Sequence, residues 1–116
     1  MKKVLIVEDD LIIALSTEKM IEQIGYQVVG RVTTGEEAVE MAFSTHPDVI
    51  LMDIRLAGEM DGIEAASQIL NGNSNPTLIY VTGNTDQIYK DRAKETGYKA
   101  FLTKPVQMQE LKKTIG

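Results

Sequence analysis

The amino-acid sequence predicts an α/β fold with a single doubly wound sheet of five parallel strands and helices on both faces. Along the 116 residues, short runs of apolar, often branched side chains alternate with stretches in which apolar residues recur at helical spacing. The most apolar runs have no polar position, which is typical of parallel strands that are covered on both faces. Right-handed connections between such strands leave few ways to wind the sheet.

Three of the predicted strands lie in the first half of the chain, at residues 4–7, Gln27–Val32 and Val49–Met52. Apolar residues at helical spacing predict a helix between the first two strands. A second helix should begin at the capping-box sequence of residues 34–37 and end before Pro47.

The second half of the chain continues the alternation. Asp61 and Glu64 can cap a helix that runs to about Leu70, and a strand should follow at residues 77–81. We expect a polar helix at 86–96, a short strand at 100–102 and a final helix after the Lys-Pro sequence.

The relative polarity of the strands predicts their order in the sheet. The strands at 4–7, Val49–Met52 and 77–81 are the most apolar and should be central. The strand at Gln27–Val32 is more polar and the strand at 100–102 is short, so both suit the edges. The order 2-1-3-4-5 satisfies these conditions.

The composition limits the compartment and the partners. The length is that of one domain, which we place at residues 1–116. The absence of cysteine excludes disulfides and thiolate sites. No apolar run approaches the length of about 20 residues that a membrane span needs. A formal net charge of −5 with scattered basic residues argues against direct nucleic-acid binding. We therefore expect a soluble cytoplasmic protein.

Polar residues follow four of the five predicted strands: Glu8-Asp9-Asp10, Asp53, Thr82-Gly83 and Thr103-Lys104-Pro105. In an open α/β sheet, ligands bind beyond the carboxyl ends of the strands, so these groups should converge. Neighbouring carboxylates repel unless a cation lies between them, and hard oxygen ligands suit Mg²⁺. Phosphoryl transfer needs positioning and charge neutralisation, and a carboxylate such as Asp53 can act as the nucleophile.

Glu8-Asp9, Asp53, Thr82 and Lys104-Pro105 resemble, in order and spacing, the five-part signature of response-regulator receiver domains. The resemblance runs from Lys3 to about Ile115 and implies a flavodoxin-like fold. It also implies a signalling switch that a sensor histidine kinase or phosphotransfer protein phosphorylates and a downstream effector reads. Such a domain catalyses only its own phosphorylation and dephosphorylation, so we do not expect an ordinary enzyme.

The resemblance assigns roles to single residues at the acidic end of the site. Asp53 matches the phosphorylation site. Asp9 and Asp53, with the backbone carbonyl of Arg55, match the ligands of Mg²⁺, while Glu8 acts through water. The loop after Asp53 departs from the family because Ala57 replaces a common proline and the loop is about one residue longer.

The resemblance also assigns the residues that respond to the phosphoryl group. Thr82 and Lys104 match the pair that contacts it, and the bond between Lys104 and the following proline should be cis. Phe101 occupies the place of an aromatic switch but lacks the tyrosine hydroxyl, so any switch must act by packing. Arg55 and Asn84 lie where relatives tune the lifetime of the phosphoryl group.

Several alternatives stay open at this point. Asp10 is expected to cap a helix more readily than to bind metal, and Phe101 can equally be a core residue. A haloacid-dehalogenase-type phosphatase also uses an aspartate nucleophile, but it carries a second aspartate where this chain has Arg55. A flavodoxin-like or degenerate binding module is disfavoured because the acids at residues 8–10 would repel a flavin phosphate and the signature is intact.

Overall fold

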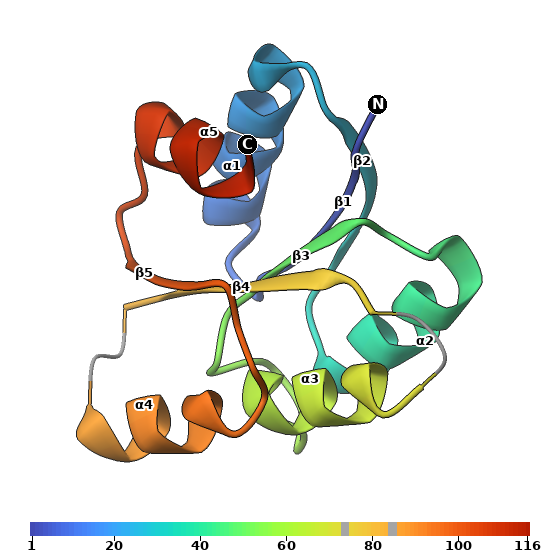
Figure 1. Ribbon diagram of the computed structural model, residues 1–116, viewed down its shortest axis with the longest axis vertical. Helices are drawn as coiled ribbons and strands as arrows, with labels where there is room; N and C mark the ends of the chain where they lie inside the picture. Colours follow the sequence, from blue (N-terminus) through green and yellow to red (C-terminus); the bar gives the residue numbers. More distant parts are fainter. Residues whose placement is uncertain (73–74, 84–85) are drawn as a thin grey trace.

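The computed structural model describes residues 1–72, 75–83 and 86–116. Its centre is one five-stranded sheet with the order β2-β1-β3-β4-β5, in which every pairing is parallel (Figure 1). This confirms the predicted order and the central position of the three most apolar strands. The strands are β1 (Lys3–Val7), β2 (Gln27–Val32), β3 (Val49–Met52), β4 (Thr77–Thr82) and β5 (Ala100–Thr103).

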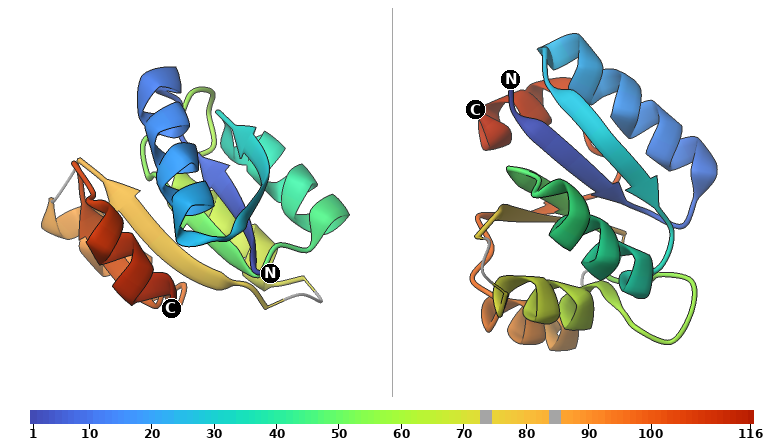
Figure 2. Two further views of the ribbon diagram at one scale, coloured as in Figure 1. Left: turned by 90° about the horizontal axis from the view of Figure 1, so that it is seen from above. Right: turned by 90° about the vertical axis from the view of Figure 1, so that its right-hand side faces the viewer.

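Helices cover both faces of the sheet, as predicted. The first and last helices of the chain lie on one face and the helices between them lie on the other, which makes a three-layer molecule (Figures 1 and 2). The first pair is α1 (Leu11–Ile24) and α5 (Met108–Ile115); the other three are α2 (Gly35–Thr45), α3 (Gly62–Leu70) and α4 (Gln87–Lys94). No helix within the described ranges is long and apolar enough to span a membrane.

The sheet separates two hydrophobic cores. In β1, Val4 and Ile6 join the core beneath α1 and α5, whereas Leu5 and Val7 join the core beneath the other three helices. Successive side chains of a strand point to opposite faces, so an entirely apolar strand supplies both cores.

Side-chain caps fix where three helices begin. Asp10 accepts hydrogen bonds from the backbone N–H groups of Ile12 and Ile13 at 3.0 and 3.1 Å, so it caps α1 as expected. Asp61 and Glu64 form the predicted reciprocal capping box of α3.

The predicted capping box of α2 is only half formed. Thr34 Oγ1 accepts from the Glu37 N–H at 3.1 Å, as a cap should. The Glu37 carboxylate, however, accepts from the N–H of Thr33 rather than from that of Thr34. The helix start is therefore where the sequence predicts it, with a different second bond.

Some boundaries differ from those the sequence predicts. β4 and β5 each extend one residue further, because Thr82 pairs with Thr103 at the end of the ladder. α4 is shorter than predicted: the N–H groups of Glu95 and Thr96 bond to carbonyls three residues back, and Gly97 has a φ of +69°. Such bonds tighten and end the helix.

Candidate functional site

The backbone of the sheet brings the candidate residues to one edge. Beyond β3, the Asp53 N–H donates to the Val7 carbonyl at 3.0 Å, and beyond β5 the Lys104 N–H donates to the Thr82 carbonyl at 3.0 Å. These bonds continue the parallel ladder past the strand ends. The residues that follow neighbouring strands therefore lie side by side, as the sequence predicts.

These residues line a pocket of about 520 Å³ at the carboxyl edge of the sheet. The pocket contains every predicted site residue within the described ranges except Phe101. Its lining comprises Glu8, Asp9, Asp10, Ile13, Asp53, Arg55, Thr82, Gly83, Asp86 and Lys104.

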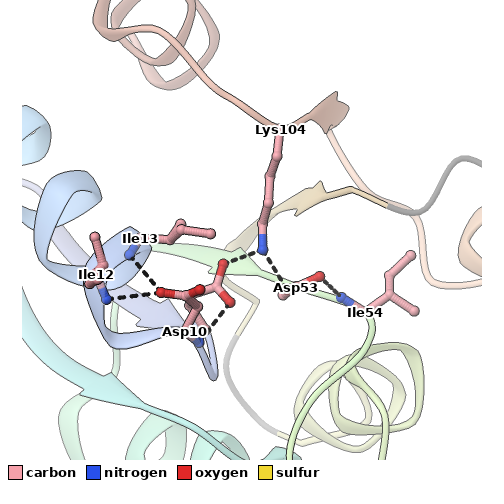
Figure 3. Close-up of polar contacts among 7 residues, drawn as sticks. Asp10, Ile12, Ile13, Asp53, Ile54 and Lys104 are labelled. Atoms are coloured by element: carbon pink, nitrogen blue, oxygen red, sulfur yellow. Dashed lines mark hydrogen bonds and ion pairs between the residues drawn. The ribbon is translucent and has the colours of Figure 1, made fainter.

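Lys104 is the centre of the polar contacts in the pocket. Its Nζ lies 2.6 Å from Asp53 Oδ2 and also forms an ion pair with Glu8 Oε1, and Figure 3 shows it reaching from the end of β5 to Asp53. Asp53 Oδ1 accepts from the Ile54 N–H at 2.7 Å. Glu8 and Asp53 are each only 6% exposed. The ammonium group of Lys104 thus forms ion pairs with two buried carboxylates.

This arrangement changes the protonation of Glu8 and Lys104. Burial raises the pKa of Glu8 to about 7, against the opposing hydrogen bonds from Lys104 and the Asp10 N–H, and the charge of Asp53 adds to the rise. Burial alone would lower the pKa of Lys104, but the hydrogen bonds to Asp53 and Glu8 outweigh it, so that the net pKa is raised. Burial thus favours a proton on Glu8, and the two neighbouring carboxylates keep Lys104 charged.

Three acids in the pocket have the geometry of a cation site. Carboxylate oxygens of Glu8, Asp9 and Asp53 all lie within 4.8 Å of one another. Oxygen donors of this kind suit a hard divalent ion such as Mg²⁺, which keeps part of its water shell. Arg55 lines the pocket with an exposed side chain, and the role of its backbone carbonyl stays a prediction.

The two predicted switch residues lie in different places. Thr82 is buried and lines the pocket. Phe101 is partly buried outside it, with its ring centroid 5.8 Å from those of both Tyr80 and Tyr98. The core interpretation of Phe101 is therefore supported, and its switching role stays a prediction.

Two further expectations concern the neighbourhood of the pocket. The Lys104–Pro105 bond is cis, as the resemblance implies. Asn84, which the resemblance places among the residues that tune phosphoryl lifetime, lies outside the described residues.

Sequence reasoning missed some features around the site. Asp86 and Ile13 line the pocket, and Asp86 could have been placed there because its helix follows the carboxyl end of β4. The long loop after Asp53 is held against the start of α2: the Ala57 N–H donates to the Thr33 carbonyl at 3.3 Å, and Ala57 forms a parallel bridge with Thr34. No local pattern signals this contact between distant loops.

Comparison with known proteins is consistent with this geometry. Residues 4–116 match the family model of the response regulator receiver domain. The transcriptional regulatory protein PdtaR of Mycobacterium tuberculosis is 34% identical over 110 residues, which are 95% of this chain and 53% of that protein. The chain therefore spans about half the length of this relative.

Solved structures share both the fold and part of the sequence. The signal receiver domain of a modulated diguanylate cyclase from Desulfovibrio desulfuricans is 37% identical with a TM-score of 0.93, over 99% of this chain and 90% of that one. The receiver domain of sensor histidine kinase PA1611 from Pseudomonas aeruginosa was solved with a magnesium ion in its active-site cleft. It is 31% identical with a TM-score of 0.87, over 97% of this chain and 92% of that one. A family match over nearly the whole length, together with these likenesses, shows that the chain belongs to the response regulator receiver domains of two-component signalling.

Proposed function

We propose that residues 1–116 act as one receiver domain in which Asp53 accepts a phosphoryl group from a phosphohistidine of a sensor kinase or phosphotransfer protein. The observation that carries the proposal is the contact of 2.6 Å between Lys104 Nζ and Asp53 Oδ2 in a pocket that opens to solvent. A buried carboxylate held by one ammonium, beside further acids, is poised for an incoming phosphoryl group.

The transfer needs no other reactant. A carboxylate oxygen of Asp53 forms a bond to phosphorus while the bond from phosphorus to the imidazole nitrogen breaks, and the bonding electron pair stays on the imidazole. Lys104 then pairs with a phosphoryl oxygen in place of the Asp53 oxygen it contacts at rest. Attack of water on the acyl phosphate reverses the modification, and the domain promotes both steps on itself.

Asp9 and Asp53, together with the Arg55 backbone carbonyl, would hold Mg²⁺, with Glu8 acting through water. The fit rests on the carboxylate oxygens that lie within 4.8 Å of one another and on the magnesium ion in the related receiver domain of PA1611. A bound Mg²⁺ supplies positive charge that offsets the repulsion between the acids and the phosphoryl oxygens.

Thr82 is the residue that senses the modification. Thr82 lines the pocket from the end of β4, and a threonine hydroxyl can donate to a phosphoryl oxygen. Its movement would alter the packing of Phe101, and a downstream effector would read the resulting shift between two populated states.

The partner that donates the phosphoryl group would dock beside the pocket. On α1, Leu11 and Ile12 are 61% and 80% exposed, and Ile13 on the same helix lines the pocket. Exposed apolar residues next to a reactive pocket are typical of a protein interface. A phosphatase activity of the haloacid-dehalogenase type has no such support, since Arg55 replaces its general acid.

Incubation with acetyl phosphate and Mg²⁺, followed by intact-mass measurement, tests the proposal. The wild type should gain one phosphoryl group, and Asp53→Asn should gain none. Asp91→Asn, a matched change at an exposed aspartate of α4, should behave as the wild type. A gain that survives Asp53→Asn would refute the assignment.

A further inference from the structure

A chain of two hydrogen bonds connects β4 to the carboxyl end of α4. Tyr80 has no exposed surface, and its hydroxyl lies 2.9 Å from Thr96 Oγ1, just beyond the end of the helix. Thr96 Oγ1 donates to the Ala93 carbonyl at 2.6 Å. Because a threonine hydroxyl has a single proton, Tyr80 must be the donor in the first bond. The order of donation is therefore Tyr80 to Thr96 to Ala93.

A second contact holds the same end of α4. Arg92 Nη2 lies 2.9 Å from Asp61 Oδ2, and Asp61 is the N-cap of α3. Ala93, next to Arg92, is completely buried. The carboxyl end of α4 is thus joined to the sheet beneath it and to the helix beside it.

The amino end of α4 has a different environment. Gln87 is exposed, and Ile88 is 72% exposed. Ala93 is the buried residue of this helix. The hydrogen bonds and the ion pair described above therefore hold the carboxyl end of α4, whereas its first turn carries the exposed Gln87 and Ile88 and packs against the core through Tyr89.

β4 relates this arrangement to the phosphoryl pocket. Tyr80 and Thr82 are two residues apart on one strand, so their side chains project from the same face. Thr82 lines the pocket, and it is the amino end of α4 that follows it in the chain. A movement of Thr82 would therefore act first on the amino end of α4.

We propose that the bonds joining Tyr80, Thr96 and Ala93 form a latch that keeps the carboxyl end of α4 in place when Asp53 is phosphorylated. The response of α4 is then confined to its amino end, which carries the exposed Ile88. The confinement rests on the proposed phosphorylation of Asp53, whereas the latch itself is a property of the unmodified protein.

Amide hydrogen exchange followed by NMR can report on the two ends separately. The N–H groups of Tyr89 and Lys90 bond to the Asp86 carbonyl at 3.1 and 3.2 Å and report on the amino end. Those of Glu95 and Thr96 bond to carbonyls of Arg92 and Ala93 at 3.2 and 3.0 Å and report on the carboxyl end.

Tyr80→Phe removes the first donor of the latch and leaves the bond from Thr96 to Ala93 in place. No buried polar group loses its partner, so the variant should fold. Tyr98→Phe is the matched control, because the Tyr98 ring packs 5.6 Å from Tyr80 in the same aromatic cluster and its hydroxyl takes no part in the latch.

In the unmodified protein, Tyr80→Phe should speed exchange at Glu95 and Thr96 about three- to tenfold, the effect of losing one ordinary hydrogen bond. Tyr98→Phe should leave these rates within about twofold. If the two variants give equal rates at both amides, the latch is refuted, whether or not the domain is phosphorylated.

After acetyl phosphate treatment, intact mass shows whether the phosphoryl group is present. In the wild type, exchange should then change at Tyr89 and Lys90 and stay the same at Glu95 and Thr96, whereas in Tyr80→Phe it should change at all four. Equal changes at both ends of wild-type α4 would overturn the confinement. A wild type that takes up no phosphoryl group would instead overturn the proposed function, which the mass measurement distinguishes.

Discussion

Glu8, Asp53 and Lys104 determine the electrostatics of the site at the scale of single residues. Both carboxylates are buried and both contact the same ammonium group. Burial of the Glu8 carboxyl, with a smaller contribution from the charge of Asp53, raises its pKa to about 7, so the site favours a proton on Glu8 below that pH. Binding of a divalent cation would remove the need for that proton.

The unfolding free energy of the metal-free protein should therefore fall as the pH rises from about 4.5 to about 7. The pKa of Glu8 is raised from 4.5 to about 7 in the fold, so the folded state binds the proton more tightly than the unfolded state. The stabilisation is fully present below the unfolded pKa and is lost as the pH rises through the folded one. Urea unfolding across this range should show a loss on the order of 1–3 kcal/mol.

Glu8→Gln provides the control for this pH dependence. Glutamine does not titrate, so the variant should lack the Glu8 component while keeping that of every other group. Saturating Mg²⁺ should also reduce the dependence in the wild type, because it favours the ionised carboxylate. Identical pH profiles for wild type and variant would show that Glu8 does not hold the proton.

At this scale the sequence predicts where the acids and the lysine lie, because each follows a strand of known direction. It does not predict which groups pair. The ion pair between Glu8 and Lys104, and the bond from Tyr80 to Thr96, depend on side-chain lengths and on the spacing of packed elements. The placement of Phe101 among tyrosines has the same origin.

Close backbone approach positions the elements around Asp53. A Cβ on Gly62, the first residue of α3, would lie 1.9 Å from the Asp53 carbonyl oxygen. The Gly62 N–H also donates to the Ile54 carbonyl at 2.7 Å. α3 therefore begins directly against the backbone of Asp53, and only glycine allows this contact.

Gly62→Ala should destabilise the fold and impair phosphoryl uptake. The added methyl group must displace the Asp53 backbone, and overpacking of this kind costs about 1–3 kcal/mol. Urea unfolding measures the loss. Gly83→Ala is the control, because a Cβ there would meet no atom within 4 Å. Equal stability of the two variants would contradict the role given to Gly62.

Ile12→Glu tests the exposed apolar surface of α1. The residue is 80% exposed, so the change should leave stability and labelling by acetyl phosphate unaffected. Transfer from a histidine-kinase preparation that labels the wild type should fall about tenfold or more, as expected when an apolar anchor is lost. Ile88→Glu, at the 72% exposed isoleucine of α4, should not slow that transfer. A uniform effect of both variants would argue against docking at α1.

The sequence predicts the bounds of a helix or strand well where neighbouring residues mark its start or end. The reciprocal cap of α3 is visible as Asp61 and Glu64 three residues apart. The end of α4 is not visible in the sequence, because tight turns at residues 95–97 replace further helical hydrogen bonds. The bridge between Thr34 and Ala57 joins loops that are far apart in the chain, so no periodicity reveals it.

The architecture of the whole molecule follows from apolar content and handedness. Strands covered on both faces must be central, and parallel connections are right-handed, so the order β2-β1-β3-β4-β5 was predictable. The acids gathered at one edge of this sheet should make the stability of the entire domain sensitive to cations. Removal of a bound metal ion should therefore lower the free energy of global unfolding.

Mg²⁺ should raise the thermal midpoint of the wild type in a concentration-dependent manner. Binding to the folded state alone contributes about 2.7 kcal/mol at a hundredfold excess over Kd. EDTA should abolish the shift, and Asp9→Asn should reduce it. Asp10→Asn should retain it, because asparagine caps α1 as well as aspartate does. A loss in Asp10→Asn equal to that in Asp9→Asn would make Asp10 a ligand.

The partition of the interior by the sheet has a spectroscopic consequence. The chain has four tyrosines and no tryptophan. Tyr80, Tyr89 and Tyr98 pack in the core beneath α2, α3 and α4, and Tyr26 alone packs in the other. Intrinsic ultraviolet fluorescence therefore samples mainly the layer that contains Phe101 and α4. An emission change without a matching change in far-ultraviolet dichroism would mark rearrangement of that layer in a protein that needs no added label.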